Sequence, residues 1–258
     1  MNLKGKVAVV TGGSRGIGRG LVEALLTQGA SVVFNGRSLE KGRQAVVELN
    51  VGERAHFIAG DVTKRSACER VIDAAVERYG ALHILINNAG GSGGFAPVAE
   101  LSDEAWLQAY AWNVHSAFYC TRRALKHMLP RRWGRIINIS SVEGKHGKGG
   151  IAHYVSAKHA LNGFTKAAAQ EVGTEGITVN AICPGLILTD IVQESGAAAA
   201  KAMGLTMEQM LARFAADAAI KRLNKVEEVA AMAMLLCSEE GAGITGALLS
   251  VDGGTAAY

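Results

Sequence analysis

Seven short apolar runs recur along this chain of 258 residues, separated by longer stretches that contain polar residues. The runs are rich in β-branched side chains and almost continuous in hydrophobicity, as is typical of parallel strands covered on both faces. They occupy residues 7–10, 31–34, 56–58, 84–86, 136–139, 178–182 and 247–251. Between the first two runs, Ile17, Leu21 and Leu25 recur with helical spacing before Gly29, a residue type that commonly ends helices. Strands that alternate with helices predict right-handed βαβ units.

The predicted fold is therefore α/β, a doubly wound parallel sheet of seven strands with helices on both faces. Residues 1–258 are expected to form a single domain, because no linker or internal repeat divides the chain. Longer helices are expected over about 103–129 and 153–173. The segment 190–221 is rich in Ala and Met and carries no strand pattern. We predict a helix that starts at residues 206–209 within it and a lid over a substrate site, since long connections often close binding sites.

Charge and cysteine usage argue against several classes of partner. Lys and Arg number 27 against 23 Asp and Glu, and only 5% of residues are aromatic, so no nucleic-acid partner is expected. The densest basic cluster is interpreted as a solvated face or a subunit contact; it comprises Arg131, Arg132, Arg135, Lys145 and Lys148. The cysteines lack metal-ligand spacing, which predicts buried, reduced thiols and no metal site; they are Cys68, Cys120, Cys183 and Cys237.

Two further features bear on location. No apolar run approaches the ~18 residues of a membrane span. The first residues lead directly into the first predicted strand, without the apolar core of a signal peptide. We therefore expect a cytoplasmic protein with no membrane partner.

A glycine-rich loop lies between the first predicted strand and the first predicted helix. Residues 11–18 read TGGSRGIG, which places Gly12, Gly16 and Gly18 at this junction. Glycines there let the backbone approach a pyrophosphate held at the positively polarised N-terminus of the helix. The loop predicts a dinucleotide-binding Rossmann fold; the alternative is a tight turn with no ligand. It also gives a use for part of the 32 glycines of the chain.

The end of the second predicted strand indicates which dinucleotide binds. A Rossmann domain that selects NAD carries Asp or Glu there, on the ribose 2′-hydroxyl. Residues 34–38 read FNGRS and contain no acid, whereas Arg37, with Arg15 from the glycine loop, is suited to a 2′-phosphate. We therefore expect NADP(H) rather than NAD(H).

A tyrosine and a lysine share one face of the helix predicted after the fifth strand. Tyr154 and Lys158 are spaced i, i+4. A tyrosine hydroxyl ordinarily has a pKa of about 10, and a nearby ammonium is expected to lower that pKa, which suits a group that exchanges a proton with an alcohol oxygen. Ser140 and Ser141 close the preceding strand, at the carboxyl edge where such sheets bind ligands.

Taken in order, these motifs resemble those of the short-chain dehydrogenase/reductases over essentially the whole chain. The matching segments are residues 11–18, Asp61 with Val62, residues 87–90, Asn113, Ser141, Tyr154 with Lys158, Pro184 and Gly185 with Thr189, and residues 251–254. The resemblance implies an oxidoreductase that passes hydride between a nicotinamide and a ketone or secondary alcohol.

The resemblance also implies a role for each matching residue. Tyr154 is expected to be the general acid of reduction and the base of oxidation, Ser141 to bind the carbonyl oxygen, and Lys158 to hold the nicotinamide ribose. Asn113 is expected to support a proton relay through water; the alternative is a polar residue that only bends its helix. The residues implied in cofactor binding are Gly12, Ser14, Arg15, Gly16, Ile17, Gly18, Arg37, Asp61, Val62, Asn88, Ala89, Gly90, Tyr154, Lys158, Pro184, Gly185, Ile187 and Thr189.

Within the family, the chain most resembles 3-oxoacyl-[acyl-carrier-protein] reductases, as in residues 134–137 (GRII) and 176–180 (GITVN). Two differences from the sequences of those reductases favour a substrate other than a 3-oxoacyl carrier protein. Glu175 stands where those reductases typically carry a basic residue, although Arg131 and Arg132 match another such position. The 190–221 segment is also longer, as in 3-hydroxybutyrate dehydrogenases. We favour a small or medium ketone, with a 3-oxoacyl thioester of a carrier protein or CoA as the alternative.

Other classes explain less of the sequence. A catalytically inactive member that binds a dinucleotide as a sensor would usually lack the Tyr–Lys pair, which this chain keeps. A methyltransferase of Rossmann type would explain the glycine loop alone. By resemblance, we expect a homotetramer that pairs through its long helices and through its last helix and strand. His146 is expected either at the substrate mouth or on a plain surface loop, and His153, His159 and Cys183 are interpreted as packing or solvent-contacting residues.

Overall fold

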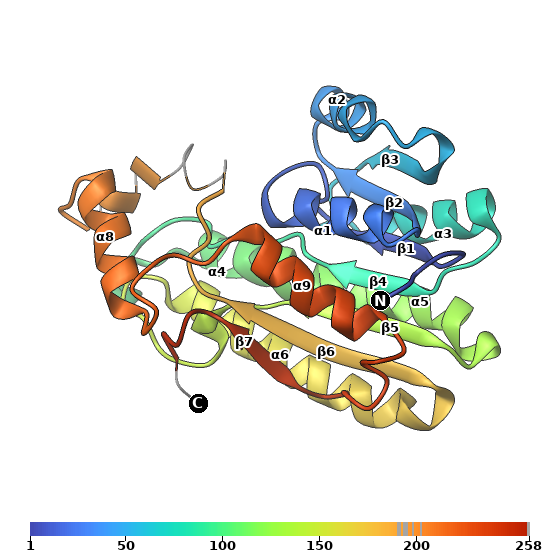
Figure 1. Ribbon diagram of the computed structural model, residues 1–258. Coiled ribbons are helices and arrows are strands. Elements are labelled where there is room, and N and C mark those ends of the chain that lie inside the picture. Colours follow the sequence, from blue (N-terminus) through green and yellow to red (C-terminus); the bar gives the residue numbers. More distant parts are fainter. Residues whose placement is uncertain (190–191, 193–195, 198, 202, 257–258) are drawn as a thin grey trace.

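The computed structural model describes residues 1–189, 192, 196–197, 199–201 and 203–256, and these form one parallel sheet of seven strands (Figure 1). The strands are β1 (Val7–Val10), β2 (Ser31–Gly36), β3 (Ala55–Ala59), β4 (Ile84–Asn87), β5 (Gly134–Ile139), β6 (Ile177–Pro184) and β7 (Leu248–Val251). Their order across the sheet is β3-β2-β1-β4-β5-β6-β7, and every neighbouring pair is parallel. The predicted doubly wound α/β fold is confirmed.

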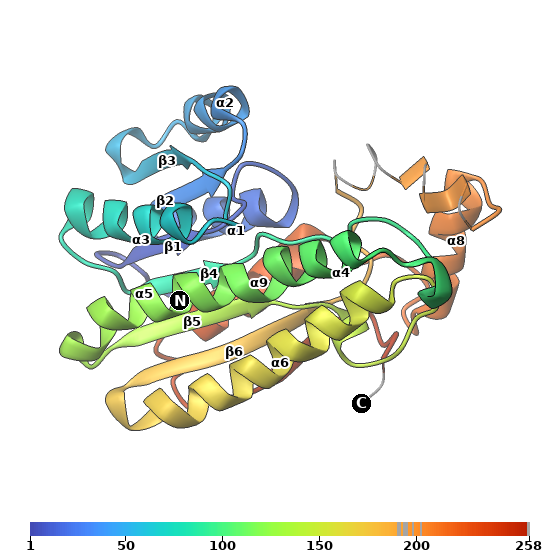
Figure 2. The same cartoon turned by 180° about the vertical axis from the view of Figure 1, so that it is seen from behind.

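Helices cover both faces of the sheet (Figures 1 and 2). They are α1 (Gly16–Thr27), α2 (Leu39–Leu49), α3 (Arg65–Tyr79), α4 (Asp103–Tyr110), α5 (Ser116–Met128), α6 (Ala152–Val172), α8 (Met207–Asp217) and α9 (Val226–Cys237). Short 3₁₀ turns lie at η1 (Gly52–Arg54), η2 (Val98–Glu100), η4 (Leu129–Arg131), η5 (Val142–Gly144) and η6 (Gly173–Glu175). Residues of α1 and α9 form one buried apolar cluster with the sheet, and residues of α3, α5 and α6 form the other. Alternate strand residues enter the two clusters, as expected for strands covered on both faces.

The long helix predicted over 103–129 is interrupted. A π-helical turn, Ala111–His115, stands between α4 and α5 and has Asn113 at its centre. Such turns occur frequently at functional sites. Apolar spacing predicts a helix here but does not distinguish an α-turn from a π-turn, because the two differ by one residue within a single turn. The other long helix, predicted over 153–173, is present as α6.

The helix predicted to start at residues 206–209 is present as α8, at the side of the molecule away from α2 and α3 (Figure 1). Thr206 Oγ1 accepts a hydrogen bond from the Gln209 N–H at 3.1 Å, and Gln209 Oε1 accepts one from the Thr206 N–H at 2.9 Å. This reciprocal cap fixes where the helix begins. The lid predicted over 190–221 includes residues 190–191, 193–195, 198 and 202, which lie outside the described residues.

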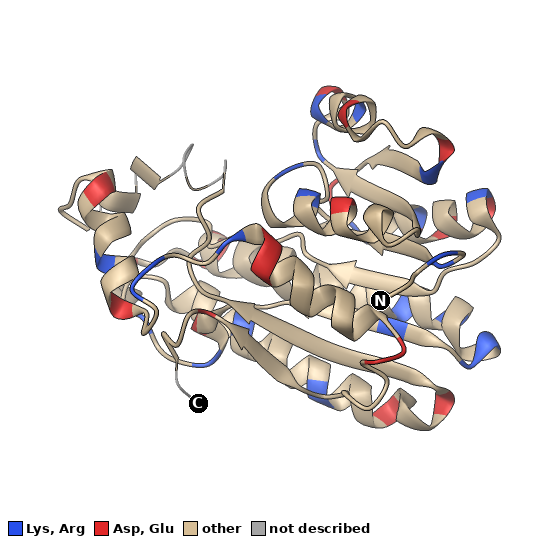
Figure 3. Cartoon of the chain, viewed as in Figure 1, with Lys and Arg blue, Asp and Glu red and all other residues tan. Residues whose placement is uncertain are grey.

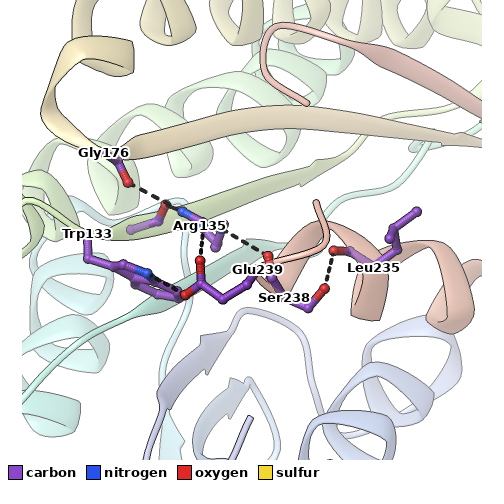
Figure 4. Close-up of polar contacts among 7 residues, drawn as sticks. Trp133, Arg135, Gly176, Leu235, Ser238 and Glu239 are labelled. Atoms are coloured by element: carbon purple, nitrogen blue, oxygen red, sulfur yellow. Dashed lines mark hydrogen bonds and ion pairs between the residues drawn. The ribbon is translucent and has the colours of Figure 1, made fainter. Parts of the chain in front are cut away.

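The basic cluster of the sequence is divided between the two ends of β5. Arg131 and Arg132 precede the strand, whereas the two lysines of the cluster follow it, and Figure 3 shows Lys and Arg spread over many elements. Arg135 is buried: its guanidinium donates to three backbone carbonyls, pairs with Glu239 and lies over the Trp133 ring (Figure 4). The interpretation as one solvated face is therefore wrong, because a parallel strand carries the residues before it and after it to opposite edges of the sheet.

The four cysteines are buried and free, as predicted. Among the described residues, no group of three or more His, Cys, Asp or Glu side chains is placed to hold a metal ion. No helix in this part of the chain has the length and apolarity of a bilayer span.

Candidate active site

The predicted site residues come together along one edge of the sheet. Each group follows the carboxyl end of a strand: the groups are residues 11–18 after β1, Arg37 after β2, Asp61 and Val62 after β3, 88–90 after β4, Ser141 after β5 and 185–189 after β6. Because all strands are parallel, these ends share the edge where open α/β sheets bind ligands. The strand order places Asp61 at one end of this edge, the glycine loop near the middle and Thr189 toward the other end.

The glycine loop is packed too closely for larger residues. Gly12 and Gly16 have positive φ angles of 65° and 56°. A Cβ on Gly18 would lie 2.2 Å from the Gly12 carbonyl oxygen. At the start of α1, Arg15 provides no side-chain cap and the first turn has no acidic residue. Within the described chain, the first N–H groups of α1 thus form a site that suits an anion.

Two residues for which no individual role was predicted, Thr11 and Asn35, hold this loop to its neighbouring strands. Thr11 Oγ1 accepts hydrogen bonds from the N–H groups of Asn88 and Ala89, both at 3.0 Å. Asn35 Oδ1, from β2, accepts one from the Gly12 N–H at 3.0 Å. Both Thr11 and Asn35 are buried. In the sequence, each of these two residues is a polar residue at the end of an otherwise apolar strand, and this pattern could have indicated a role at the site.

The end of β2 adjoins the glycine loop. A Cβ on Gly36 would lie 2.7 Å from Ser14 Oγ, and the next residue, Arg37, is exposed. This arrangement brings Arg37 to the loop that carries Arg15. At the end of β3, the Asp61 carboxylate accepts a hydrogen bond from the Thr63 N–H at 3.0 Å, and Val62 beside it is buried.

Tyr154 and Lys158 lie one turn apart on α6, and Ser141 approaches Tyr154 from the end of β5. Ser141 lies close enough to Tyr154 to act on its hydroxyl, and this interaction tends to lower the pKa of Tyr154. Lys158 is 4% exposed, and its Nζ lies 5.5 Å from the centre of the Tyr154 ring. The same Nζ donates to the Ile139 carbonyl at 2.8 Å. Two hydroxyls and one ammonium are thus gathered at the carboxyl end of β5.

The pKa of Tyr154 does not move in the direction that the sequence predicts. Burial raises the pKa of Tyr154 to about 12; the interaction with Ser141 opposes this shift, and the Glu143 carboxylate adds to it. Burial lowers the pKa of Lys158 to about 8. The expectation is wrong for the chain alone because both groups lose water, and this loss outweighs any attraction between the ammonium and a tyrosinate.

Asn113 is buried in the π-turn and contacts the segment after β4. Its Nδ2 donates to the Gly91 carbonyl at 3.0 Å and to the Ala109 carbonyl at 2.8 Å, and its Oδ1 accepts from the Gly91 N–H at 3.2 Å. A Cβ on Gly90 would lie 2.5 Å from Oδ1. Asn113 therefore does more than bend its helix, because these contacts hold the helix to the segment after β4, at the edge of the sheet where the site lies. The role of Asn113 in a proton relay stays a prediction.

The segment after β6 completes the edge. The Gly185 N–H donates to the Val251 carbonyl at 3.1 Å, and a Cβ on Gly185 would lie 3.0 Å from the Asp252 Cα. Ile187 and Thr189 are buried. The chain here passes closely beneath the turn that follows β7, with Pro184 as the last residue of β6.

The three side chains interpreted as packing or solvent-contacting residues are placed as interpreted. Cys183 is buried in β6, His153 is buried with its Nε2 donating to the Ser92 carbonyl at 2.6 Å, and the exposed His159 donates to Val155 of its own helix at 2.9 Å. His146, by contrast, contacts the carboxylate of Glu143 at 2.9 Å. Glu143 was missed, although an acid only two residues after Ser141 was a visible signal.

The arginines considered for a carrier protein lie elsewhere. Arg131 and Arg132 precede β5, and Glu175 precedes β6, so all three lie at the amino edge of the sheet. Arg132 pairs with Glu175 at 2.9 Å, and Arg131 donates to the Gly80 carbonyl at 2.9 Å. These residues therefore lie at the edge of the sheet opposite this chain's own site, which is at the carboxyl edge.

Comparisons with known proteins agree with this arrangement. A D-beta-hydroxybutyrate dehydrogenase of Cupriavidus necator is 36% identical over 254 residues, and a 3-oxoacyl-[acyl-carrier-protein] reductase of Vibrio cholerae is 39% identical; each alignment covers 98% of both chains. The crystal structure of an actinorhodin polyketide ketoreductase variant with NADPH superposes with a TM-score of 0.93 at 38% identity, over 98% of both chains.

The family is shown by a match over most of the chain. The model of the short chain dehydrogenase family matches residues 6–200, which include the glycine loop, Asn113, Ser141 and the Tyr154–Lys158 pair. The chain belongs to the short-chain dehydrogenase/reductase family.

Proposed function

We propose that this protein is an NADP(H)-dependent oxidoreductase that interconverts a ketone and a secondary alcohol. The observation that carries the proposal is the approach of Ser141 to Tyr154, with Lys158 one turn along α6, on the sheet edge that also holds the glycine loop. The hydroxyl groups of Ser141 and Tyr154 lie close together, so both can donate hydrogen bonds to the carbonyl oxygen of a ketone. Relatives named for hydroxybutyrate oxidation and ketone reduction support the same chemistry.

The residues present fit a phosphorylated dinucleotide. The lack of a Cβ at Gly12 and Gly18 lets the glycine loop pack closely against itself and the segment after β4. The first turn of α1 has no side-chain cap within the described chain, so its N–H groups suit a pyrophosphate. Arg37 and Arg15 supply positive charge suited to a 2′-phosphate. When bound, the nicotinamide supplies or accepts the hydride. The remaining contacts would come from Asp61, Val62, Asn88, Ala89, Gly90, Pro184, Gly185, Ile187 and Thr189, with Ser14, Gly16 and Ile17 in the glycine loop.

Tyr154 holds the proton that reduction requires. A pKa of about 12 keeps its hydroxyl protonated at neutral pH, and it can donate when the carbonyl oxygen gains negative charge. Ser141 orients that oxygen through its own hydroxyl. The Lys158 ammonium would hold the ribose and stabilise the tyrosinate left after proton transfer. Asn113 would support the water that returns the proton to Tyr154.

The substrate we favour is a small or medium ketone. Arg132 and Glu175 pair with each other at the opposite edge of the sheet. Within one chain, this pair therefore places no basic residue at the entrance of the site, where an acidic carrier protein would bind. A 3-oxoacyl thioester remains the second candidate, supported by the 39% identity with a carrier-protein reductase. An inactive dinucleotide sensor is a third, and the retained Asn113, Ser141, Tyr154 and Lys158 argue against it.

We further propose a single domain with a substrate lid over about 190–221, and a homotetramer in the cytoplasm. Lys148 of the loop after Ser141 contacts Phe214 of α8, which supports the lid. The four free, buried cysteines suit a reducing compartment. Exposed aromatic side chains on α4 and α5 support assembly.

Tyr154→Phe tests the proposal because it removes the hydroxyl and keeps the ring. With NADPH and ethyl acetoacetate as probe, we expect kcat to fall by about 10²–10⁴-fold. NADPH affinity, followed by fluorescence titration, should stay unchanged. Retained turnover would show that another group donates the proton. A wild-type protein that binds NADPH but reduces no member of a ketone panel would favour the sensor instead.

A further inference from the structure

Glu143 is a buried carboxylate that the chemistry above does not use. Its residue is 7% exposed and lies in η5, two residues after Ser141. Both carboxylate oxygens have cationic or ring-nitrogen partners: Oε2 lies 2.9 Å from His146 Nε2, and Oε1 lies 3.5 Å from Lys148 Nζ. Its N–H donates to Ser141 Oγ at 3.1 Å. A carboxylate buried in this way is unfavourable unless it has partners. That Glu143 is buried together with two such partners indicates that the group has a role in the protein.

Lys148 extends this group of contacts to α8. Its Nζ lies 3.8 Å from the centre of the Phe214 ring, within the range of a cation–π contact. Lys148 and Phe214 also line a small cavity of about 60 Å³ together with Met203, Arg213 and Asp217. A continuous path therefore leads from Ser141, through Glu143 and Lys148, to Phe214 on the helix of the proposed lid.

We propose that Glu143 is a positioning residue that holds the Lys148 ammonium against Phe214 and thereby fixes α8 beside the Ser141–Tyr154 pair. A lysine side chain is flexible and strongly hydrated, so a cation–π contact alone fixes it weakly. The Glu143 carboxylate restricts the ammonium to one place. Because Glu143 and Lys148 belong to the loop that follows Ser141, we expect this contact to govern how well the ketone is held and to leave proton transfer by Tyr154 intact.

Hydrogen exchange measures the position of α8 without any substrate. We expect Glu143→Gln and Lys148→Met to speed amide exchange in Met207–Asp217 by about tenfold, the change that loss of one such contact produces, with exchange in the centre of α6 unchanged. Lys148→Arg keeps a cation and should exchange as the wild type does. Lys145→Met is the matched control, because Lys145 lies in the same loop but donates to Ser250 Oγ at 2.8 Å.

The kinetic consequence rests on the proposed function. With NADPH and ethyl acetoacetate, Lys148→Met should raise KM for the ketone by about tenfold, with kcat and KM for NADPH unchanged, and Lys148→Arg should restore the wild-type KM. A fall in kcat with KM unchanged would contradict a positioning role. If the wild type reduces no ketone, the proposed function fails, whereas the exchange experiment still decides the role of Glu143.

Unchanged exchange of α8 in both Glu143→Gln and Lys148→Met would overturn the inference. If Glu143→Gln fails to fold, as judged by circular dichroism, Lys148→Met and Phe214→Leu decide in its place, since both side chains are partly exposed. The double variant Lys148→Met with Phe214→Leu should exchange no faster than either single variant, because both break the same contact. Additive acceleration would mean that the two residues hold α8 independently.

Discussion

At the scale of single residues, Lys158 combines a proposed role in the site with a cost to folding. Burial lowers its pKa from the usual 10.5 to about 8. Between these two values, the unfolded chain binds a proton that the folded chain has released. The free energy of unfolding therefore rises with pH across this window, and it is lowest below pH 8, where folding must bury the ammonium.

Lys158→Met should therefore stabilise the fold at neutral pH while removing a site residue. We expect the free energy of unfolding at pH 7 to increase by up to about 3 kcal/mol, less the loss of the bond to the Ile139 carbonyl. The gain should shrink as pH approaches 10.5. Urea unfolding at pH 7 and pH 10 measures it, with exposed Lys166→Met on the same helix as control. A gain independent of pH would contradict the argument.

Arg37 is the residue on which we propose that the choice of dinucleotide depends. Its guanidinium is exposed at the end of β2, and no acid stands in residues 34–38 to favour a free 2′-hydroxyl. Arg37→Ala should lower the ratio of kcat/KM for NADPH over NADH by about tenfold or more, since a charge-assisted contact to phosphate is lost. Arg43→Ala, an exposed arginine on α2, is the control. A wild-type preference for NADH would overturn the assignment.

At the scale of elements, a buried polar chain joins α6 to the centre of the sheet. Asn87 Nδ2 on β4 donates to Asn138 Oδ1 on β5 at 2.8 Å, and Asn138 Nδ2 donates to Thr165 Oγ1 on α6 at 2.8 Å. All three side chains are buried. Because α6 also carries Tyr154 and Lys158, this chain of bonds places both relative to Ser141 at the end of β5.

Thr165→Val tests this anchor, since it keeps the shape and leaves the Asn138 amide without its acceptor. The free energy of unfolding should fall by about 1–3 kcal/mol, measured by urea titration. Thr178→Val on β6 is the matched control. Its hydroxyl is buried with no hydrogen-bond partner among the described residues, so the same change there should be neutral or stabilising. Equal losses at both positions would refute the anchor.

The elements themselves were largely readable from the sequence, because hydrophobic pattern and capping are local. The seven strands, α6 and the start of α8 at Thr206 all follow from such signals. The π-turn around Asn113 and the raised pKa of Tyr154 do not. Both depend on how segments distant in sequence surround a residue, and burial in particular is a property of the packed chain. Glu143 has partners close in sequence, His146 and Lys148, but its burial and the contact of Lys148 with Phe214 of α8 depend on the packed chain in the same way.

At the scale of the whole molecule, α4 and α5 lie on the outside of the sheet (Figure 2) and carry exposed apolar side chains. Trp106, Leu107 and Phe118 are exposed there, the ring of Trp106 lies 5.4 Å from that of Tyr110, and that of Phe118 lies 6.2 Å from that of Phe164 on α6. The apolar residues of α9, in contrast, are taken up by the core of the chain itself. If the chain assembles as we propose, these exposed side chains make α4 and α5 a better candidate interface than the apolar face of α9.

Sedimentation velocity tests assembly through this face. The wild type should sediment as a tetramer, at four times the 27.0 kDa of one chain. Phe118→Glu places a charge on a side chain that is 38% exposed and should reduce the assembly to dimers or monomers, because a buried unpaired carboxylate strongly opposes association. Val47→Glu on α2, at a residue that is 77% exposed, should leave the tetramer intact. A monomeric wild type, or equal dissociation by both variants, would exclude this face as the interface.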